Sequence, residues 1–343
     1  MTTHQPIRVG LPLQDYQKLQ SNQLTQQNIR VGKRDLRGVY WISFLIILLL
    51  ILKHQHTNHF ERRINQFEID KTDRDSWKKF DERIKRLNSK VFIETLRTMF
   101  EMIFIARHGE GFHNIAESKY GTPMWDCYWS ELNGDQNLTW GPDSRLSPKG
   151  QNQIKLARES WKREISRSIP LPSLFITSPL SRAIETLEIT SVWNVSKNTV
   201  PEVREGWREN IGLHTCDLRR TREEIYKDFG FVEFENRFNE TDELWTKDFQ
   251  ETSEQLDIRI RKSLETLFND PNDQKHTYVS ITCHSGVINS LLRVIGHRPF
   301  PTQTGGMIPL VIKGSVNPTP TRPPLPGPSA TKPDCPIDSS SSN

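Results

Sequence analysis

The stretch of sequence that decides the fold is EMIFIARHGEGFHN, residues 101–114. It begins with a short apolar run, MIFIA (102–106), which is typical of a buried β-strand. The run stops at Arg107, and His108 and Gly109 follow directly. Ligands of open α/β sheets bind beyond the carboxyl ends of the strands. A charged and an imidazole side chain at such an end therefore predict a functional loop.

Four further apolar runs have the length of buried strands. They are LFIT (174–177), TVPEV (199–203), YVSIT (278–282) and MIPLVI (307–312). Helical patterns lie between them, one after the cap Ser147-Pro148 and one after Pro179. Strands that alternate with helices predict a mostly parallel sheet with helices on both faces. The predicted fold class is therefore α/β, a three-layer α/β/α arrangement.

The composition excludes several classes of protein. Lys and Arg total 46 against 42 Asp and Glu, and a formal charge of +4 gives no sign of nucleic-acid binding. The hydrophobic fraction of 34% and the mean hydropathy of −0.63 exclude a polytopic membrane protein. The spacing of the cysteines predicts neither a zinc site nor a disulfide framework. They are Cys127, Cys216, Cys283 and Cys335.

Changes in composition divide the chain into five segments. Residues 1–38 are polar and Gln-rich and predict a disordered tail, whereas 39–52 (VYWISFLIILLLIL) are apolar. Residues 53–100 are predicted to be a charged, helical linker, and 101–313 the folded, catalytic domain. The last segment, 314–343, is rich in Pro and Ser and predicts a second disordered tail.

The apolar stretch 39–52 allows three interpretations. A signal-peptide core has this length, but the tail before it is long and no A-x-A site follows. A buried helix would normally show a polar stripe. We expect a single-pass membrane anchor, although a helix of about 21 Å is short for a hydrocarbon core about 30 Å thick. Lys33, Arg34 and Arg37 precede the stretch and favour a luminal domain, whereas Arg62 follows it. A cytoplasmic protein is expected if the stretch is no anchor.

Three strand-to-loop junctions carry side chains suited to an anion. Arg107 and His108 form the first junction. Arg182 belongs to the second, after LFIT, and His284 to the third, after YVSIT. Because the carboxyl ends of parallel strands share one edge, we expect these side chains to meet in one cleft. Guanidinium groups bind phosphate oxygens in bidentate fashion and stay charged, so the cleft is predicted to bind phosphate.

The two histidines supply the chemistry of phosphoryl transfer. A neutral imidazole can attack phosphorus to give a phosphohistidine, and neighbouring cations keep the ring unprotonated. The second imidazole can stabilise the transferring group, so that side chains replace a metal. The leaving oxygen needs a proton. The best candidate for this acid lies in the segment 208–217, after TVPEV, and Glu110, Glu202 and Glu205 are nearby alternatives.

Together these motifs resemble the histidine phosphatase superfamily. The shared motifs are Arg-His-Gly (107–109), Ser-Pro-Leu-x-Arg (178–182) and Cys-His-Ser-Gly (283–286). Over 101–313 the chain is more closely similar to the phosphoglycerate-mutase-like branch, because His284 is followed by Ser285-Gly286, whereas the acid phosphatases usually have Asp directly after this His. The segment 89–100 (SKVFIETLRTMF) departs from the pattern and is interpreted as an insertion or an artefact of the sequence.

The resemblance implies a role for each matching residue. His108 is the expected nucleophile, and His284 completes the pocket. Arg107 and Arg182 are expected to bind the phosphate, as is Asn114, which matches a residue that contacts the phosphoryl group.

Residues near the expected acid have less definite roles. The resemblance implies that Glu209 is the proton donor. His214 and Asp217 either shape the substrate pocket or hold their loop, so they stay outside the catalytic set. Cys283 is interpreted as a small residue that fills the end of its strand.

The expected function is hydrolysis of a small phosphomonoester through phosphohistidine, without a metal or other cofactor. Two alternatives stay open. A phosphoglycerate-type mutase would use the same pocket and differ in substrate and in the exclusion of water. A catalytically silent scaffold would keep the fold to bind phosphate. Neither the substrate nor the oligomeric state follows from the sequence.

Overall fold

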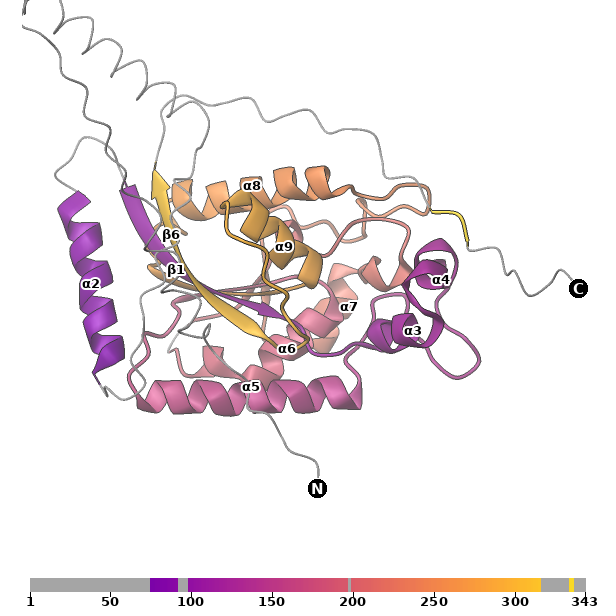
Figure 1. Ribbon diagram of the computed structural model, residues 1–343, viewed down its shortest axis with the longest axis horizontal. Coiled ribbons are helices and arrows are strands. Elements are labelled where there is room, and N and C mark those ends of the chain that lie inside the picture. The colour runs from indigo at the N-terminus through magenta and orange to yellow at the C-terminus, as the bar shows by residue number, and fades with distance from the viewer. Residues whose placement is uncertain (1–74, 92–97, 197–198, 316–332, 336–343) are drawn as a thin grey trace, which may run out of the picture. The chain divides into compact units, whose positions relative to one another are not determined.

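A six-stranded sheet forms the centre of the computed structural model, which describes residues 75–91, 98–196, 199–315 and 333–335 (Figure 1). The order of the strands across the sheet is β4-β3-β2-β5-β1-β6. The strands are β1 (Thr98–Arg107), β2 (Leu174–Thr177), β3 (Glu202–Val203), β4 (Glu233–Phe234), β5 (Tyr278–Cys283) and β6 (Met307–Ser315). Neighbouring strands are parallel except β1 and β6, which confirms the predicted mostly parallel sheet.

Helices connect the strands. The α-helices in the described part of the chain are α2 (Ser76–Val91), α3 (Phe112–Tyr120), α4 (Thr122–Cys127), α5 (Pro148–Ser166), α6 (Ser181–Thr190), α7 (Arg222–Asp228), α8 (Ser253–Asn269) and α9 (Ser285–Val294). The predicted cap is present, because the Ser147 hydroxyl accepts a bond from Gly150 N at 3.0 Å and Pro148 opens α5. Short 3-10 turns add Trp129–Glu131, Val192–Asn194, Glu205–Trp207 and Thr215–Asp217.

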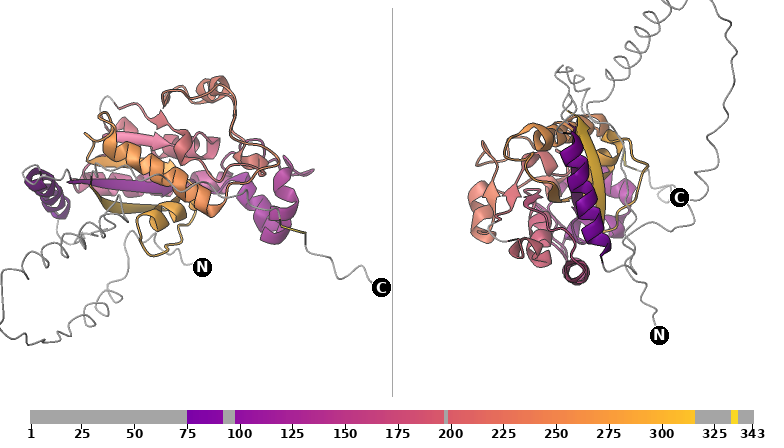
Figure 2. Two further views of the ribbon diagram at one scale, coloured as in Figure 1. Left: turned by 90° about the horizontal axis from the view of Figure 1, so that it is seen from above. Right: turned by 90° about the vertical axis from the view of Figure 1, so that its left-hand side faces the viewer.

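The strand β1 separates two apolar layers, because successive side chains of a strand point to opposite faces. Ile103 and Ile105 pack with α8 and α9, whereas Phe104 packs with Trp161 of α5 and Leu187 of α6. Burying one such side chain stabilises the fold by about 1.5–3 kcal/mol. Figures 1 and 2 show these helices on the two sides of the sheet, and the predicted three-layer α/β/α fold is confirmed.

One edge of the sheet differs from the sequence prediction. Only Glu202–Val203 of the predicted strand 199–203 is extended and paired, and β4 adds two residues that no apolar run marks. A strand of two residues is too short to give a periodic pattern, so sequence alone misjudges this edge.

The helix α2 packs against the sheet. Its Trp77, Phe80 and Ile84 are buried in the same layer as Phe104. The Asn88 side chain bonds the backbone N and O of Phe100 in β1, at 2.8 and 3.1 Å. Part of the segment interpreted as an insertion therefore belongs to α2 and β1. We propose that the folded domain starts with α2.

The predicted membrane anchor is corrected here. No helix within the residues that the structure describes is long and apolar enough to cross a membrane. The stretch 39–52 lies outside these residues, as do the tail 1–38 and most of 314–343. As a helix the stretch would reach only about 21 Å across a hydrocarbon core about 30 Å thick. The membrane partner, the single-pass topology and the luminal location predicted from it are therefore withdrawn.

A disulfide joins Cys127 of α4 to Cys335. The sequence predicts no disulfide framework, because these partners stand 208 residues apart and such a separation leaves no local pattern. Cys216 and Cys283 are free thiols and are buried. Burial raises the pKa of the Cys283 thiol well above its usual value, so this side chain stays protonated beside His284.

Candidate active site

The three predicted junctions meet at one edge of the sheet. Hydrogen bonds extend the pairing just beyond the strands, since His108 N donates to Cys283 O and Ser178 N donates to Thr282 O, each at 3.0 Å. The strands β2, β5 and β1 are neighbours in that order. The loops after them therefore bring the predicted arginines and histidines together.

The imidazole of His108 is held in a defined orientation. Its Nδ1 lies 2.6 Å from Gly109 O, so Nδ1 carries the proton that is donated to this carbonyl. Arg182 Nε points to the other nitrogen, Nε2, at 3.3 Å. Burial and the charge of Arg182 lower the pKa of His108 well below its usual range. The ring is therefore neutral, with its lone pair on Nε2.

Arg182 is buried and fixed by the loop that follows Glu209. Its Nη2 lies 2.6 Å from Asp217 Oδ1, and its Nη1 donates to Cys216 O at 2.8 Å. Breaking a buried ion pair by removing one partner costs about 3–5 kcal/mol. Asp217, which the sequence leaves without a definite role, therefore holds the guanidinium beside His108.

His284 and Ser178 form a buried pair. His284 follows β5 and immediately precedes α9, with its Nε2 2.7 Å from Ser178 Oγ. Burial and the charge of Arg182 lower the pKa of His284 well below its usual range, so this ring is also neutral. Its ring centroid lies 5.0 Å from that of His108.

Three buried nitrogen atoms near His108 have no hydrogen-bond partner within the described residues. They are Arg107 Nε, His113 Nδ1 and His284 Nδ1. Each unsatisfied buried polar group lowers the free energy of unfolding by about 1–3 kcal/mol. A fold that keeps three such atoms together is therefore suited to a ligand that forms hydrogen bonds with these atoms. Arg107 is anchored by one bond, from Nη1 to Thr302 O at 2.9 Å. Donors of this kind suit a phosphate.

Glu209 lies in the same cluster. Its Oε2 accepts a bond from Gly286 N at 3.1 Å, and its Oε1 accepts one from Asn210 N at 3.2 Å. Burial and the charge of Asp217 raise the pKa of Glu209 above its usual value. The charge of Glu209 also acts on Arg107. A carboxyl group that keeps its proton near a phosphate site can serve as an acid.

The alternative acids are engaged in other contacts. Glu110 lies 2.7 Å from Lys149 and 2.8 Å from Ser147. Glu202 pairs with Arg204 at 2.6 Å, and Glu205 bonds arginines of its own loop. Of the four candidate acids, Glu209 is therefore the one whose carboxyl group contacts a residue of the three junctions.

Asn114 closes the first turn of α3. Its Oδ1 accepts a bond from Gly111 N at 3.0 Å. The side-chain amide nitrogen then remains available as a donor. The structure therefore brings four predicted residues together around His108, namely Arg107, Arg182, Glu209 and His284, whereas the contact of Asn114 is with Gly111 in its own turn.

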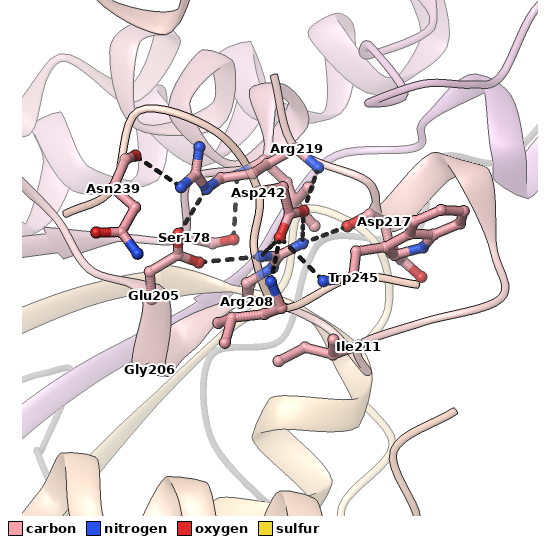
Figure 3. Close-up of polar contacts among 12 residues, drawn as sticks. Ser178, Glu205, Gly206, Arg208, Ile211, Asp217, Arg219, Asn239, Asp242 and Trp245 are labelled. Atoms are coloured by element: carbon pink, nitrogen blue, oxygen red, sulfur yellow. Dashed lines mark hydrogen bonds and ion pairs between the residues drawn. The ribbon is translucent and has the colours of Figure 1, made fainter. Parts of the chain in front are cut away.

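A buried network supports the loop that carries Glu209 (Figure 3). Both terminal nitrogens of Arg208 donate to the Asp242 carboxylate, at 2.9 and 2.5 Å, and Nη1 also donates to Glu205 at 3.1 Å. Its Nη2 also donates to Asp217 O at 2.7 Å. This bidentate pair fixes the backbone on both sides of the Glu209 to Asp217 segment.

Sequence reasoning misses two members of the site. His113 is buried, and its ring centroid lies 5.4 Å from that of His108. Burial and the charge of Arg182 lower its pKa well below the usual range, so it is neutral. Ser178 is the partner of His284. His113 lies in GEGFHN and Ser178 lies in Ser-Pro-Leu-x-Arg. Their position in a motif that contains an assigned site residue is the sequence signal that could have identified them.

One set of possible metal ligands occurs in the part of the chain that the structure describes, formed by His214, Cys216 and Asp217. Asp217 is already paired with Arg182 at 2.6 Å. Burial raises the pKa of the Cys216 thiol well above its usual value, so it stays protonated. A guanidinium supplies the positive charge at this place, and the set fits a cation poorly.

The chain belongs to the histidine phosphatase superfamily (branch 1), whose family model matches residues 103–304. The match includes every predicted site residue. The fold and the family together define a phosphatase or mutase-type enzyme that acts on a small phosphorylated substrate.

Three fungal relatives are similar over much of their length. A "Probable phosphoglycerate mutase" of Arthroderma benhamiae is 40% identical over 240 residues, 69% of this chain and 70% of that protein. "Phosphomutase-like protein 3" of Candida albicans is 37% identical over 64% of this chain and 68% of its own. "Probable phosphoglycerate mutase PMU1" of Saccharomyces cerevisiae is 34% identical over 64% and 80%. These names agree with the predicted mutase-like branch.

Proposed function

We propose that the protein is a phosphatase that hydrolyses a phosphomonoester through phosphohistidine at His108, without a metal. The observation that carries this proposal is the orientation of His108. Its Nδ1 bonds Gly109 O at 2.6 Å, and its unprotonated Nε2 accepts a bond from Arg182 Nε at 3.3 Å. A neutral nitrogen held next to a cation suits attack on a bound phosphoryl group.

In the first step, His108 Nε2 attacks phosphorus while the bond from phosphorus to the ester oxygen breaks. Arg107 and Arg182 neutralise the oxygens of the transferring group, and Asn114 donates to one of them. Glu209 gives its proton to the departing oxygen, so the alcohol leaves neutral. The enzyme then carries a phosphoryl group on Nε2, and Glu209 is a carboxylate.

In the second step, water attacks phosphorus and the bond from phosphorus to Nε2 breaks. The Glu209 carboxylate takes the proton of this water, because the group that acts as an acid in one direction acts as a base in the other. Nε2 regains its lone pair and inorganic phosphate leaves. His284 donates to the phosphoryl oxygens through Nδ1 in both steps.

A mutase is the second candidate, because two of the relatives bear the name phosphoglycerate mutase. It would use the same phosphohistidine but return the phosphoryl group to a sugar acid. A silent scaffold is not favoured, since each catalytic position carries a residue capable of its role.

The test is release of inorganic phosphate from phenyl phosphate and glycerol 3-phosphate by the full chain. We expect His108→Ala to lose nearly all turnover. The matched control is His276→Ala, because His276 lies 2.8 Å from Ser173 at the opposite end of β5. Interconversion of phosphoglycerates with a bisphosphate primer, faster than hydrolysis, would instead establish the mutase. Equal activity of the two variants would refute the role of His108.

A further inference from the structure

The helix α3, which carries His113 of the candidate site, also carries a carboxylate. Glu117 lies four residues after His113 on α3, so the two side chains share one face of the helix. His113 lies beside His108, and the charge of Glu117 acts on Arg107. Glu117 is half-buried. Its place on the His113 face of α3 and its effect on Arg107 put it near the proposed phosphate site.

The helix α4 adds a second carboxylate. Asp126 follows Trp125, whose ring lies edge-on to that of His214 with centroids 6.0 Å apart. Burial raises the pKa of Asp126, and the charges of His214 and Glu117 act on it in opposite directions. Glu117 and Asp126 are thus neighbours, and we call them the acidic rim.

The acidic rim has no cation of its own. Glu117 accepts a bond from the neutral hydroxyl of Thr122 at 2.9 Å. Neither Glu117 nor Asp126 forms an ion pair with any lysine or arginine of the described ranges. The charges that act on the acidic rim from outside are those of Arg107, at the proposed phosphate site, and of His214.

Other arginines around the Glu209 loop are occupied by carboxylates. Figure 3 shows Arg208 paired with Asp242, and Arg219 paired with Glu205. Arg259 forms an ion pair with Glu251 at 2.5 Å. A buried ion pair is costly to break, so these side chains cannot turn to a substrate carboxylate.

We propose that the pocket selects phosphomonoesters whose alcohol part carries no negative charge. This inference rests on the proposed phosphatase function and narrows its substrate class. A carboxylate on the alcohol would approach the acidic rim, and Arg208, Arg219 and Arg259 are already paired and would not receive it. Like charges brought together in a partly buried site are strongly disfavoured. The inference sets this chain apart from what the names of its relatives suggest.

The test compares two esters that differ only in charge. They are 4-carbamoylphenyl phosphate, which is neutral outside the phosphate, and the isosteric 4-carboxyphenyl phosphate. We expect the full chain to show at least about a tenfold higher kcat/KM for the neutral ester. Likewise, kcat/KM for glycerol 3-phosphate should exceed kcat/KM for 3-phosphoglycerate. Raising the salt from about 0.05 to about 0.5 M should lower the ratio of the two kcat/KM values, because salt screens the charges of a rim that is open to solvent.

Variants test whether the acidic rim causes the preference for the neutral ester. The double variant Glu117→Gln, Asp126→Asn should reduce the preference to less than about threefold, because it removes both like charges. The matched control is Glu159→Gln, since Glu159 is exposed on α5 and pairs with Lys162 at 2.7 Å. This control should keep the wild-type ratio.

Two results would overturn the inference. One is a wild-type preference for the carboxylate ester, and the other is an unchanged ratio in the double variant. Either leaves phosphatase activity standing. Absence of hydrolysis of both aryl esters would refute the proposed function, and this inference with it.

Discussion

Ser178 Oγ lies 2.7 Å from His284 Nε2, and both side chains are fully buried. Leu180 N donates to the same hydroxyl oxygen at 3.3 Å, so the Ser178 proton is free to bond His284 Nε2. A ring that accepts at Nε2 carries its own proton on Nδ1. Nδ1 is the atom of His284 that has no partner within the described residues. We infer that Ser178 donates to His284 Nε2 and so favours the tautomer whose Nδ1 can donate to a phosphoryl oxygen.

Replacing Ser178 with Ala should lower kcat by about tenfold and leave KM within about twofold, because His284 can then adopt the wrong tautomer. Steady-state kinetics with phenyl phosphate measure this effect. Ser160→Ala, at an exposed serine of α5, is the control. An unchanged kcat in Ser178→Ala would show that the hydroxyl does not set the tautomer.

Replacing Gly286 with Ala should displace the Glu209 carboxyl group. A Cβ atom at Gly286 would lie 2.1 Å from Glu209 Oε1. We expect hydrolysis of an alkyl phosphate to fall by about 10²–10⁴-fold, and that of an activated aryl phosphate far less, since its oxygen leaves without a proton. Gly230→Ala is the control, because its nearest neighbour would be Tyr226 O at 3.5 Å. An equal loss for both substrates would place the acid elsewhere.

The dependence of activity on pH should reflect two pKa shifts in opposite directions. The pKa of His108 is lowered, first by burial and then by Arg182, so the neutral nucleophile persists below the usual histidine range of about 6.5. The pKa of Glu209 is raised, first by burial and then by Asp217, so the acid keeps its proton above the usual range of about 4.3. For an alkyl phosphate, kcat/KM should therefore peak at acidic pH, after correction for titration of the substrate. Glu209→Gln should lack the alkaline limb, and an alkaline limb that survives in this variant would contradict the assignment.

Removal of metal ions should leave the activity unchanged. In the proposed mechanism Arg107 and Arg182, whose charges both act on His108, supply the positive charge at the phosphate in place of a divalent ion. The measurement is turnover before and after incubation with excess EDTA. Loss of turnover that added Mg²⁺ or Zn²⁺ restores would overturn the metal-free mechanism.

The sequence predicted the centre of the sheet and the residues at its edge for one physical reason. Apolar runs such as 102–106 and 278–282 are unambiguous strands, and the residue after a parallel strand must stand at the ligand-binding edge. Arg107, His108 and His284 follow from this local pattern alone. Glu209 lies in a long loop, and only the bond from Gly286 N brings it to the others.

Features that depend on distant partners did not follow from the sequence. The disulfide between Cys127 and Cys335 joins segments with no common pattern. Ser178 gains its role only from His284, which stands 106 residues later. The membrane prediction was wrong, because no helix in the described part of the chain is long and apolar enough to cross a membrane, and the stretch 39–52 is short for a hydrocarbon core.

The most direct test is the site of phosphorylation. The full chain is mixed with phenyl phosphate, quenched within milliseconds in base, and the phosphoenzyme is examined by ³¹P NMR and peptide mass spectrometry. We predict an acid-labile, base-stable phosphoryl group on His108, at Nε2, because Nδ1 is held 2.6 Å from Gly109 O. It should be absent in His108→Ala. A phosphoryl group on Nδ1 or on another residue, or a phosphoenzyme that forms normally in His108→Ala, would contradict the account.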